Sequence, residues 1–144
     1  MKTILAVSMT IVLVSACETT SSSVSSKNGR VTTASLASQG AVELSQAETI
    51  AFYQGKSGPW INDRGSQYFQ VDGTYLWRLN GGEVEDGTWR VDALGDLCLT
   101  VPEWYDGVEA CHDIWRKSDG SLILFYPSGN TGVPKPMVEG DSQL

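Results

Sequence analysis

The stretch QYFQVDGTYLWRL, residues 67–79, decides the fold class of this chain. Two runs rich in aromatic and apolar residues flank Asp72-Gly73, and this arrangement is the strongest short-range signal for a β-hairpin. A two-residue turn at this dipeptide would pair Phe69 with Leu76 on the neighbouring strand. We therefore expect antiparallel strands from this point onward.

Three further turn signals follow along the chain, at residues 81–82, 92–95 and 119–120. They predict an up-and-down meander of six or seven strands, and such a series tends to close because closure removes exposed strand edges. We therefore predict a mainly β domain, either a small antiparallel meander barrel or a curved sheet. Counting outward from each turn predicts one cross-strand pair. The turn at 81–82 pairs Leu79 with Val84, the turn at 92–95 pairs Trp89 with Cys98, and the turn at 119–120 pairs Trp115 with Leu124.

One short helix is expected before the strands, over residues 45–54. Ser45 followed by Glu48 forms a capping box, and Gly55 suits the position just after the end of a helix. The last strand, residues 122–126, is apolar on both faces. We expect one of these faces to meet the helix and the other to meet the barrel interior.

Cys98 and Cys111 are expected to form a disulfide. If the strands on either side of Trp104-Tyr105 are antiparallel, the two cysteines face each other, and Trp89 covers the bridge as a packing residue. A metal site is the alternative. However, His112 follows Cys111 directly, and neighbours in a strand point to opposite faces, so we expect no metal.

Residues 1–16 have the character of a secretory signal peptide. Lys2 supplies a basic start, and the apolar stretch that follows is too short to span a membrane. LVSAC, residues 13–17, resembles the lipobox of bacterial lipoproteins, in which the cysteine becomes a lipid-bearing N-terminus; the alternative is an ordinary signal peptide with a chance cysteine. The next residue is Glu18 and not Asp. By resemblance to lipoprotein sorting, this implies a lipid anchor on Cys17 at the periplasmic face of the outer membrane.

Composition divides the remaining chain into three parts. Residues 17–41 are rich in Ser and Thr and are expected to be a flexible tether. Residues 42–130 hold the disulfide-stapled β domain, and residues 131–144 are expected to form an irregular tail. Without Lys2 the chain has 9 basic and 17 acidic residues, a formal charge of −8, which argues against nucleic acid as a partner. The expected partners are the membrane, through the anchor, and an envelope protein or cell-wall component.

Short motifs occur in order along the domain: YQGKS (53–57), YFQVDGT (68–74), DGTWRV (86–91), GDLCL (95–99), a second cysteine, and DGS (119–121). Their order and spacing resemble an uncharacterised family of exported bacterial proteins, a domain of unknown function. The resemblance covers about residues 43–130 and implies a fold and an exported location, but no activity. Gly-Thr-Trp is also similar to a feature of lipocalins and avidins, small calycin-like barrels that hold one hydrophobic ligand.

A non-enzymatic binding or adaptor domain is the favoured function. The loop over residues 102–109 places aromatic anchors beside charged groups, as binding surfaces often do. Its candidate binding residues are Trp104, Tyr105, Glu103 and Asp106. In the competing interpretation, both aromatic side chains fold back over the end of the barrel.

The sequence leaves two other functions open. A carrier of a small hydrophobic ligand needs a cavity; otherwise the aromatic residues simply fill the core. An enzyme would use Asp96 opposite Asp113, although these carboxylates can equally splay into solvent, and His112 has no nucleophile partner. We therefore expect no catalytic residue and no cofactor. The residues that would line a carrier's cavity are Tyr68, Tyr75, Trp77, Trp89 and Trp115.

Overall fold

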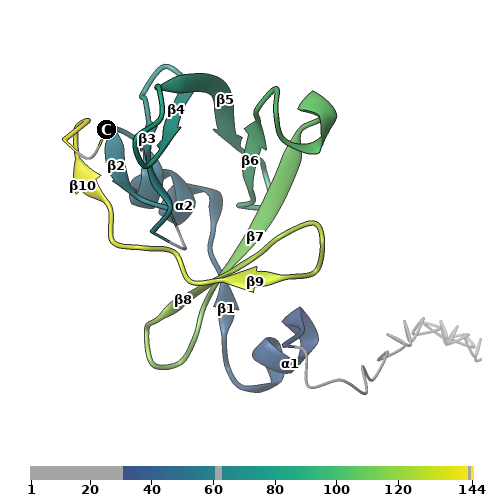
Figure 1. Cartoon of the computed structure of the whole chain (residues 1–144). Coiled ribbons are helices and arrows are strands. Elements are labelled where there is room, and N and C mark those ends of the chain that lie inside the picture. Colours follow the sequence, from purple (N-terminus) through teal and green to yellow (C-terminus); the bar gives the residue numbers. More distant parts are fainter. Residues whose placement is uncertain (1–30, 61–62, 143) are drawn as a thin grey trace, which may run out of the picture.

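The computed structural model describes residues 31–60, 63–142 and 144. In these residues, ten antiparallel strands form one strongly curled sheet, a half-barrel, with two short helices beside it (Figure 1). The protein is mainly β, as predicted, with more strands than the six or seven expected. The sheet is curved and not closed, because β9 and β10, its two outermost strands, do not pair with each other within the described part of the chain.

The predicted meander is confirmed. Across the sheet the order is β10-β2-β3-β4-β5-β6-β7-β8-β9, with β1 paired to β7, so that β2 to β9 follow one another in chain order. The strands are β1 (Val42–Glu43), β2 (Lys56–Pro59), β3 (Gly65–Phe69), β4 (Thr74–Leu79), β5 (Glu85–Val91), β6 (Leu97–Thr100), β7 (Ala110–Arg116), β8 (Leu122–Phe125), β9 (Thr131–Gly132) and β10 (Val138–Glu139).

The predicted registers of the hairpins are wrong by one residue. Phe69 pairs with Tyr75 and not with Leu76, because the loop between β3 and β4 has three residues instead of two. Its last residue, Gly73, has a φ of 91°, a left-handed conformation that glycine adopts without strain. The same kind of loop ends at Gly95 (φ 108°) between β5 and β6 and at Gly120 (φ 83°) between β7 and β8.

The same slip affects the other predicted pairs. Between β4 and β5 the observed register pairs Trp77 with Glu85, and Val84 lies outside the strands. Between β7 and β8, Trp115 pairs with Ile123. A shift of one residue moves every side chain to the opposite face of a strand, so loop length decides which residues point inward.

The register between β6 and β7 is as predicted. Cys98 lies directly opposite Cys111, and the two form a disulfide. This prediction counted outward from Trp104-Tyr105, which lie midway between the two cysteines in the sequence. It depended on two cysteines that must face each other to bond.

Trp89 does not cover the disulfide, contrary to the prediction. It pairs with Leu99, whereas Arg90 is the residue beside the bridged Cys98. The Trp89 ring instead packs edge-on against Phe69 inside the curl, and its Nε1 donates a hydrogen bond of 2.8 Å to the Gln70 carbonyl. Its role is packing, as expected, but on the opposite face of the sheet.

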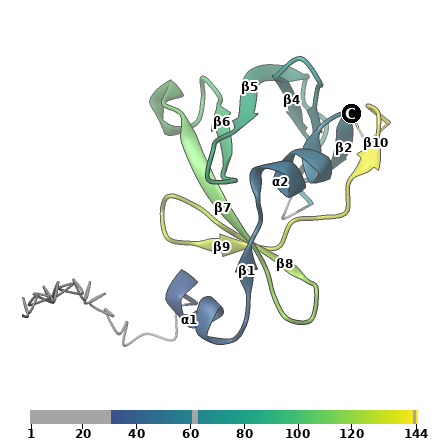
Figure 2. The ribbon, with the colours of Figure 1, turned by 180° about the vertical axis from the view of Figure 1, so that it is seen from behind.

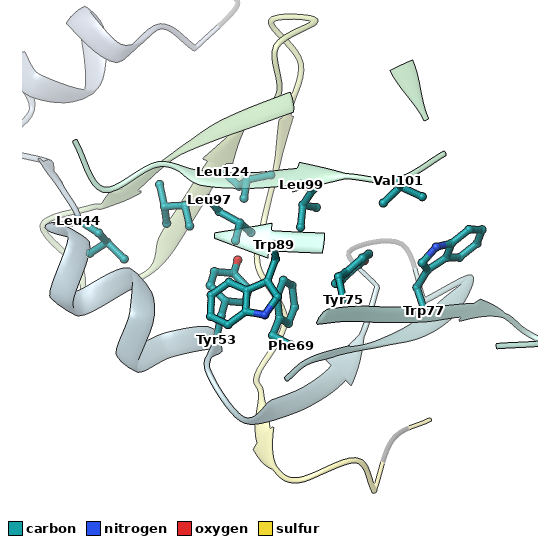
Figure 3. Close-up of a cluster of buried hydrophobic side chains, with 11 residues drawn as sticks. Leu44, Tyr53, Phe69, Tyr75, Trp77, Trp89, Leu97, Leu99, Val101 and Leu124 are labelled. Carbon is teal, nitrogen blue, oxygen red and sulfur yellow. The ribbon is translucent and has the colours of Figure 1, made fainter. Parts of the chain in front are cut away.

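The main core fills the inside of the curl (Figure 3). Leu97 and Leu99 of β6, with Leu124 of β8, face Phe69 and Tyr75 of β3 and β4 across the interior. Aromatic and aliphatic residues therefore form the two sides of the concave face.

Helix α2 (Gln46–Tyr53) begins as predicted. The Ser45 hydroxyl accepts a hydrogen bond from the Glu48 backbone N–H, and the Glu48 side chain accepts one from the Ser45 N–H, which completes the capping box. Thr49 is fully buried and donates a 2.8 Å hydrogen bond to the Gly95 carbonyl, which ties the helix to the loop between β5 and β6. Tyr53 reaches the main core.

A second helix, α1 (Thr33–Ser38), lies in the segment that was expected to be a flexible tether. Its Leu36 is 4% exposed and packs with Ile123 and Phe125 on the outer face of β8. Strand β8, which was expected to be the last strand, is therefore covered on both faces, as predicted, but α1 covers its outer face and α2 does not. Figure 2 shows α1 beyond β1, well away from α2.

The segment after residue 130, expected to be irregular, also joins the sheet. Strand β9 pairs with β8, and β10 pairs with β2. Between them, residues 133–137, which we call the strap, run across the open side of the curl (Figures 1 and 2).

Candidate ligand-binding site

The concave face of the sheet holds a pocket of about 490 Å³. One wall is mainly aromatic, the other carries leucines together with His112 and Tyr126, and the strap borders the opening. The lining residues are Tyr53, Trp60, Gln67, Phe69, Tyr75, Leu97, Leu99, Trp104, Tyr105, His112, Leu124, Tyr126, Pro134, Lys135 and Met137.

Three tryptophans gather at one end of this pocket. Trp60 stacks on Trp77 with ring centroids 5.2 Å apart, and Trp104 lies 5.1 Å from Trp77. Trp60 Nε1 donates a 3.2 Å hydrogen bond to the Tyr75 hydroxyl, which in turn donates a 3.0 Å bond to Gln67 Oε1. These bonds fix the orientation of the aromatic wall.

Trp104, predicted as a surface anchor, is instead packed against the main core. Tyr105 remains 48% exposed, and the neighbouring Glu103 and Asp106 are exposed as well. Tyr105 and Asp106 have φ values of 51° and 57°, a left-handed backbone that is costly for residues other than glycine. The structure therefore separates the four candidate residues: the Trp104 ring folds inward, Tyr105 lies half-exposed at the border of the pocket, and Glu103 and Asp106 stay exposed.

His112 is the polar residue that the structure brings into the pocket unexpectedly. It pairs with Leu97, so it points to the concave face, and it is 4% exposed. Its ring lies edge-on to Tyr126, with centroids 5.4 Å apart. Burial lowers the pKa of His112 to about 4, so the imidazole is neutral at pH 7. Its Nδ1 atom is buried and has no hydrogen-bond partner among the described residues.

The strap is held at the rim of the pocket. Lys135 Nζ lies 3.0 Å from Asp63 Oδ2, and the two side chains are 33% and 66% exposed. Met137 packs close over Gly58 of β2, where an added Cβ would lie 2.7 Å from its sulfur. The strap can approach the sheet here because the residue at position 58 is a glycine, which has no side chain.

Asp96 and Asp113 lie near each other, as predicted, but away from His112. Burial, reinforced by the Asp113 charge, raises the pKa of Asp96 to about 6. Asp113 follows His112 in β7, so their side chains point to opposite faces of the sheet. The two carboxylates and the imidazole do not share a cleft.

One group in the described residues has metal-ligand spacing: Asp92, Cys98 and Cys111, with ligand atoms within 4.8 Å of one another. Both sulfurs are already joined in the disulfide, so neither is available as a thiolate ligand.

Sequence reasoning found part of the pocket. Tyr75 lines it as expected, whereas Tyr68 lies on the outer face and Trp115 belongs to the outer cluster under α1. Leu97 and Leu99 were missed, although they alternate with Cys98 and so must share the face opposite the disulfide. The strap residues carried no local signal, because they reach the pocket only through tertiary contacts.

Cys17, the predicted lipidation site, lies outside the described residues. Within the described residues, neither helix has the length or the apolar character needed to cross a bilayer.

A family described as "Protein of unknown function (DUF995)" matches residues 14–116. The chain belongs to the DUF995 family. This agrees with the resemblance to a domain of unknown function, although the matched span begins earlier and ends earlier than expected. Comparison with curated proteins and with solved structures finds no match. The DUF995 span includes the disulfide and His112, whereas Leu124, Tyr126 and the strap lie beyond it.

Proposed function

We propose that this DUF995 protein is a non-enzymatic binding protein that holds a small, largely apolar ligand in the pocket of its curled sheet. The observation that carries the proposal is the pocket itself, with a volume of about 490 Å³. Ligand sites usually measure about 300–1,000 Å³ and are lined by apolar and aromatic groups with a few polar ones.

A packed core is the competing explanation for the aromatic residues. Protein interiors are close-packed, and voids larger than a water molecule are few. The pocket is many times larger than one water, whose share of liquid volume is about 30 Å³. The strap crosses the opening without filling the pocket. This favours a ligand-binding pocket over a packed core.

Binding of N-phenyl-1-naphthylamine, an uncharged fluorescent probe, tests this function. With the full chain carrying Cys17→Ser, we expect saturable probe fluorescence and energy transfer from the tryptophans. Leu99→Trp fills the pocket from β6 and should abolish the signal. Leu94→Trp adds the same side chain at a position that is 75% exposed and should leave it unchanged. Equal binding by both variants, or no binding by the parent chain, would refute the proposal.

We further propose that the protein is exported and anchored through lipid on Cys17 at the outer membrane. The LVSAC sequence supports the anchor, and the Cys98–Cys111 disulfide supports an oxidising compartment, where such bonds persist. Radiolabelled palmitate should enter the wild-type protein in cells and should not enter Cys17→Ser. Label in both proteins, or in neither, would contradict lipidation at this residue.

An adaptor role, in which an envelope protein or cell-wall component docks on the loop over residues 102–109, is the second candidate. It is supported by the left-handed backbone at Tyr105 and Asp106, since strain of this kind clusters at binding sites. A photo-crosslinking residue at position 105 should capture one dominant envelope partner in cells. The same probe at the exposed Leu94 is the control, and equal capture at both positions would count against the role.

A further inference from the structure

We infer that the ligand is a flat, uncharged molecule with one hydrogen-bonding group, and that His112 binds that group. This inference rests on the proposed function and specifies the chemistry of the same pocket. It follows from the unsatisfied nitrogen, the charges of the lining and the shape of the two walls.

The first observation is the unpartnered Nδ1 of His112. Buried polar atoms nearly always have a hydrogen-bond partner, because leaving one unpaired costs about 1–3 kcal/mol. His112 is 96% buried, since its exposed fraction is 4%, and it lines the pocket. Nδ1 itself is shielded from the pocket, so a polar ligand group would reach it once the imidazole turns about its Cβ–Cγ bond. The hydrogen bond would then remove this cost, whereas a hydrocarbon would not.

The second observation is the charge of the lining. Among the described residues that border the pocket, Lys135 is the one with a formal charge, and it already pairs with Asp63 at the rim. The pocket is also lined by His112, which is neutral at pH 7, and by tyrosine rings. An ionised group buried there would lack a counter-charge, and burying an unpaired ion is far more costly than burying a neutral polar group.

The third observation is the shape of the pocket. Phe69 and Tyr75 face Leu99 and Leu124 across the interior, so the aromatic wall is opposed by the wall that carries the leucines (Figure 3). A planar ring system inserted between them would cover both of its faces. Ring stacking on the aromatic side would add to the apolar area that the ligand buries.

The test compares two ligands that differ in one group, naphthalene and 2-naphthol, by equilibrium dialysis with the full chain carrying Cys17→Ser. A neutral hydrogen bond contributes about 0.5–1.5 kcal/mol, so we expect 2-naphthol to bind about two- to tenfold more tightly. His112→Phe should bring this ratio to one. Tyr126→Phe, which removes a hydroxyl from the same pocket, should keep the ratio.

A second readout needs no substitution. The chain contains a single histidine, so ¹⁵N labelling of histidine in an untagged protein reports on His112 alone. We expect 2-naphthol to shift the Nδ1 resonance and naphthalene to leave it nearly unchanged. This measurement holds even if His112→Phe fails to fold.

The outcomes separate the two proposals. If both compounds bind equally and neither shifts Nδ1 selectively, the ligand-binding function stands and the role of His112 is wrong. Loss of the ratio in Tyr126→Phe with its retention in His112→Phe also overturns that role. If neither compound binds, the proposed function fails together with the inference.

Discussion

The shifted pKa of Asp96, the residue just before β6, makes the stability of the fold depend on pH. Burial, followed by the Asp113 charge, raises the pKa of Asp96 to about 6. An aspartate in an unfolded chain titrates at about 3.9, so the folded state holds the proton more tightly. Its contribution to stability is therefore full below about pH 4 and is lost as the pH rises through about 6.

Asp96→Asn should remove this dependence. An amide resembles the protonated carboxyl, so we expect the variant and the wild type to have similar free energies of unfolding near pH 4, and the variant to be more stable at pH 7. Urea unfolding across this pH range measures the difference. Asp141→Asn removes the same charge from an exposed site and is the control. Equal stabilisation by both substitutions would point to net charge and contradict a local cause.

At the scale of the element, the three-residue loops determine which side chains face inward. Gly95 ends the loop between β5 and β6 with a φ of 108°, and an added Cβ would lie 2.2 Å from the Leu44 carbonyl oxygen before α2. Gly120 has a φ of 83° in the equivalent loop between β7 and β8, but an added Cβ there would meet nothing within 4 Å.

This contrast predicts that substitution of glycine by alanine lowers the free energy of unfolding by different amounts at the two positions. Gly120→Ala should lose only the left-handed preference, about 1–2 kcal/mol in the free energy of unfolding. Gly95→Ala adds a clash with the backbone, and we expect a loss of about 4 kcal/mol or more. Guanidinium unfolding of the two variants provides the comparison, and equal losses would show that the contact between this loop and Leu44 is unimportant.

The disulfide also acts at the scale of the element, because it joins β6 to β7. Its cysteines are separated by 13 positions, and a loop of this size is expected to stabilise the fold by about 3 kcal/mol. Cys98→Ala with Cys111→Ala should lose about this much in urea unfolding. A reductant should produce the same loss in the wild type and no further loss in the double variant. A double variant as stable as the wild type would contradict the prediction.

At the scale of the whole molecule, the strap couples the two ends of the sheet across the pocket. Gly58→Ala would place a Cβ 2.7 Å from Met137 Sδ and 3.0 Å from the Pro136 carbonyl oxygen, so the strap must move away from β2. We expect amide hydrogen exchange in residues 131–140 to become roughly tenfold faster, which corresponds to about 1.4 kcal/mol.

The matched control for this prediction is Gly82→Ala, in the loop between β4 and β5. There an added Cβ would approach only Leu79, with its oxygen 3.3 Å away. Exchange in the strap should not change in this variant. If Gly58→Ala also leaves the strap unchanged, the close approach at Gly58 does not hold it in place.

Local signals in the sequence were sufficient for α2, for the central strands of the meander and for their order. The Ser45–Glu48 capping box starts α2, the Gly-containing turns mark most of the meander, and Cys98 finds Cys111 because both lie on one face of adjacent strands. Family membership follows from the sequence as well. Each of these features depends on residues close in the chain or on a covalent bond, so little of the rest of the fold is needed to predict it.

Only the tertiary structure decided which face of the sheet each side chain occupies and which residues line the pocket. Turns that differ in length by one residue have nearly the same sequence, yet the difference moves every side chain of the next strand to the opposite face of the sheet. For this reason Trp89 lies inside the curl and not over the disulfide. The inward fold of Trp104 and the burial of His112 depend on how strongly the sheet curls. The strap and α1 reach their places through contacts with distant strands. Long-range packing therefore determined the candidate site, because curvature and strand parity are properties of the whole sheet.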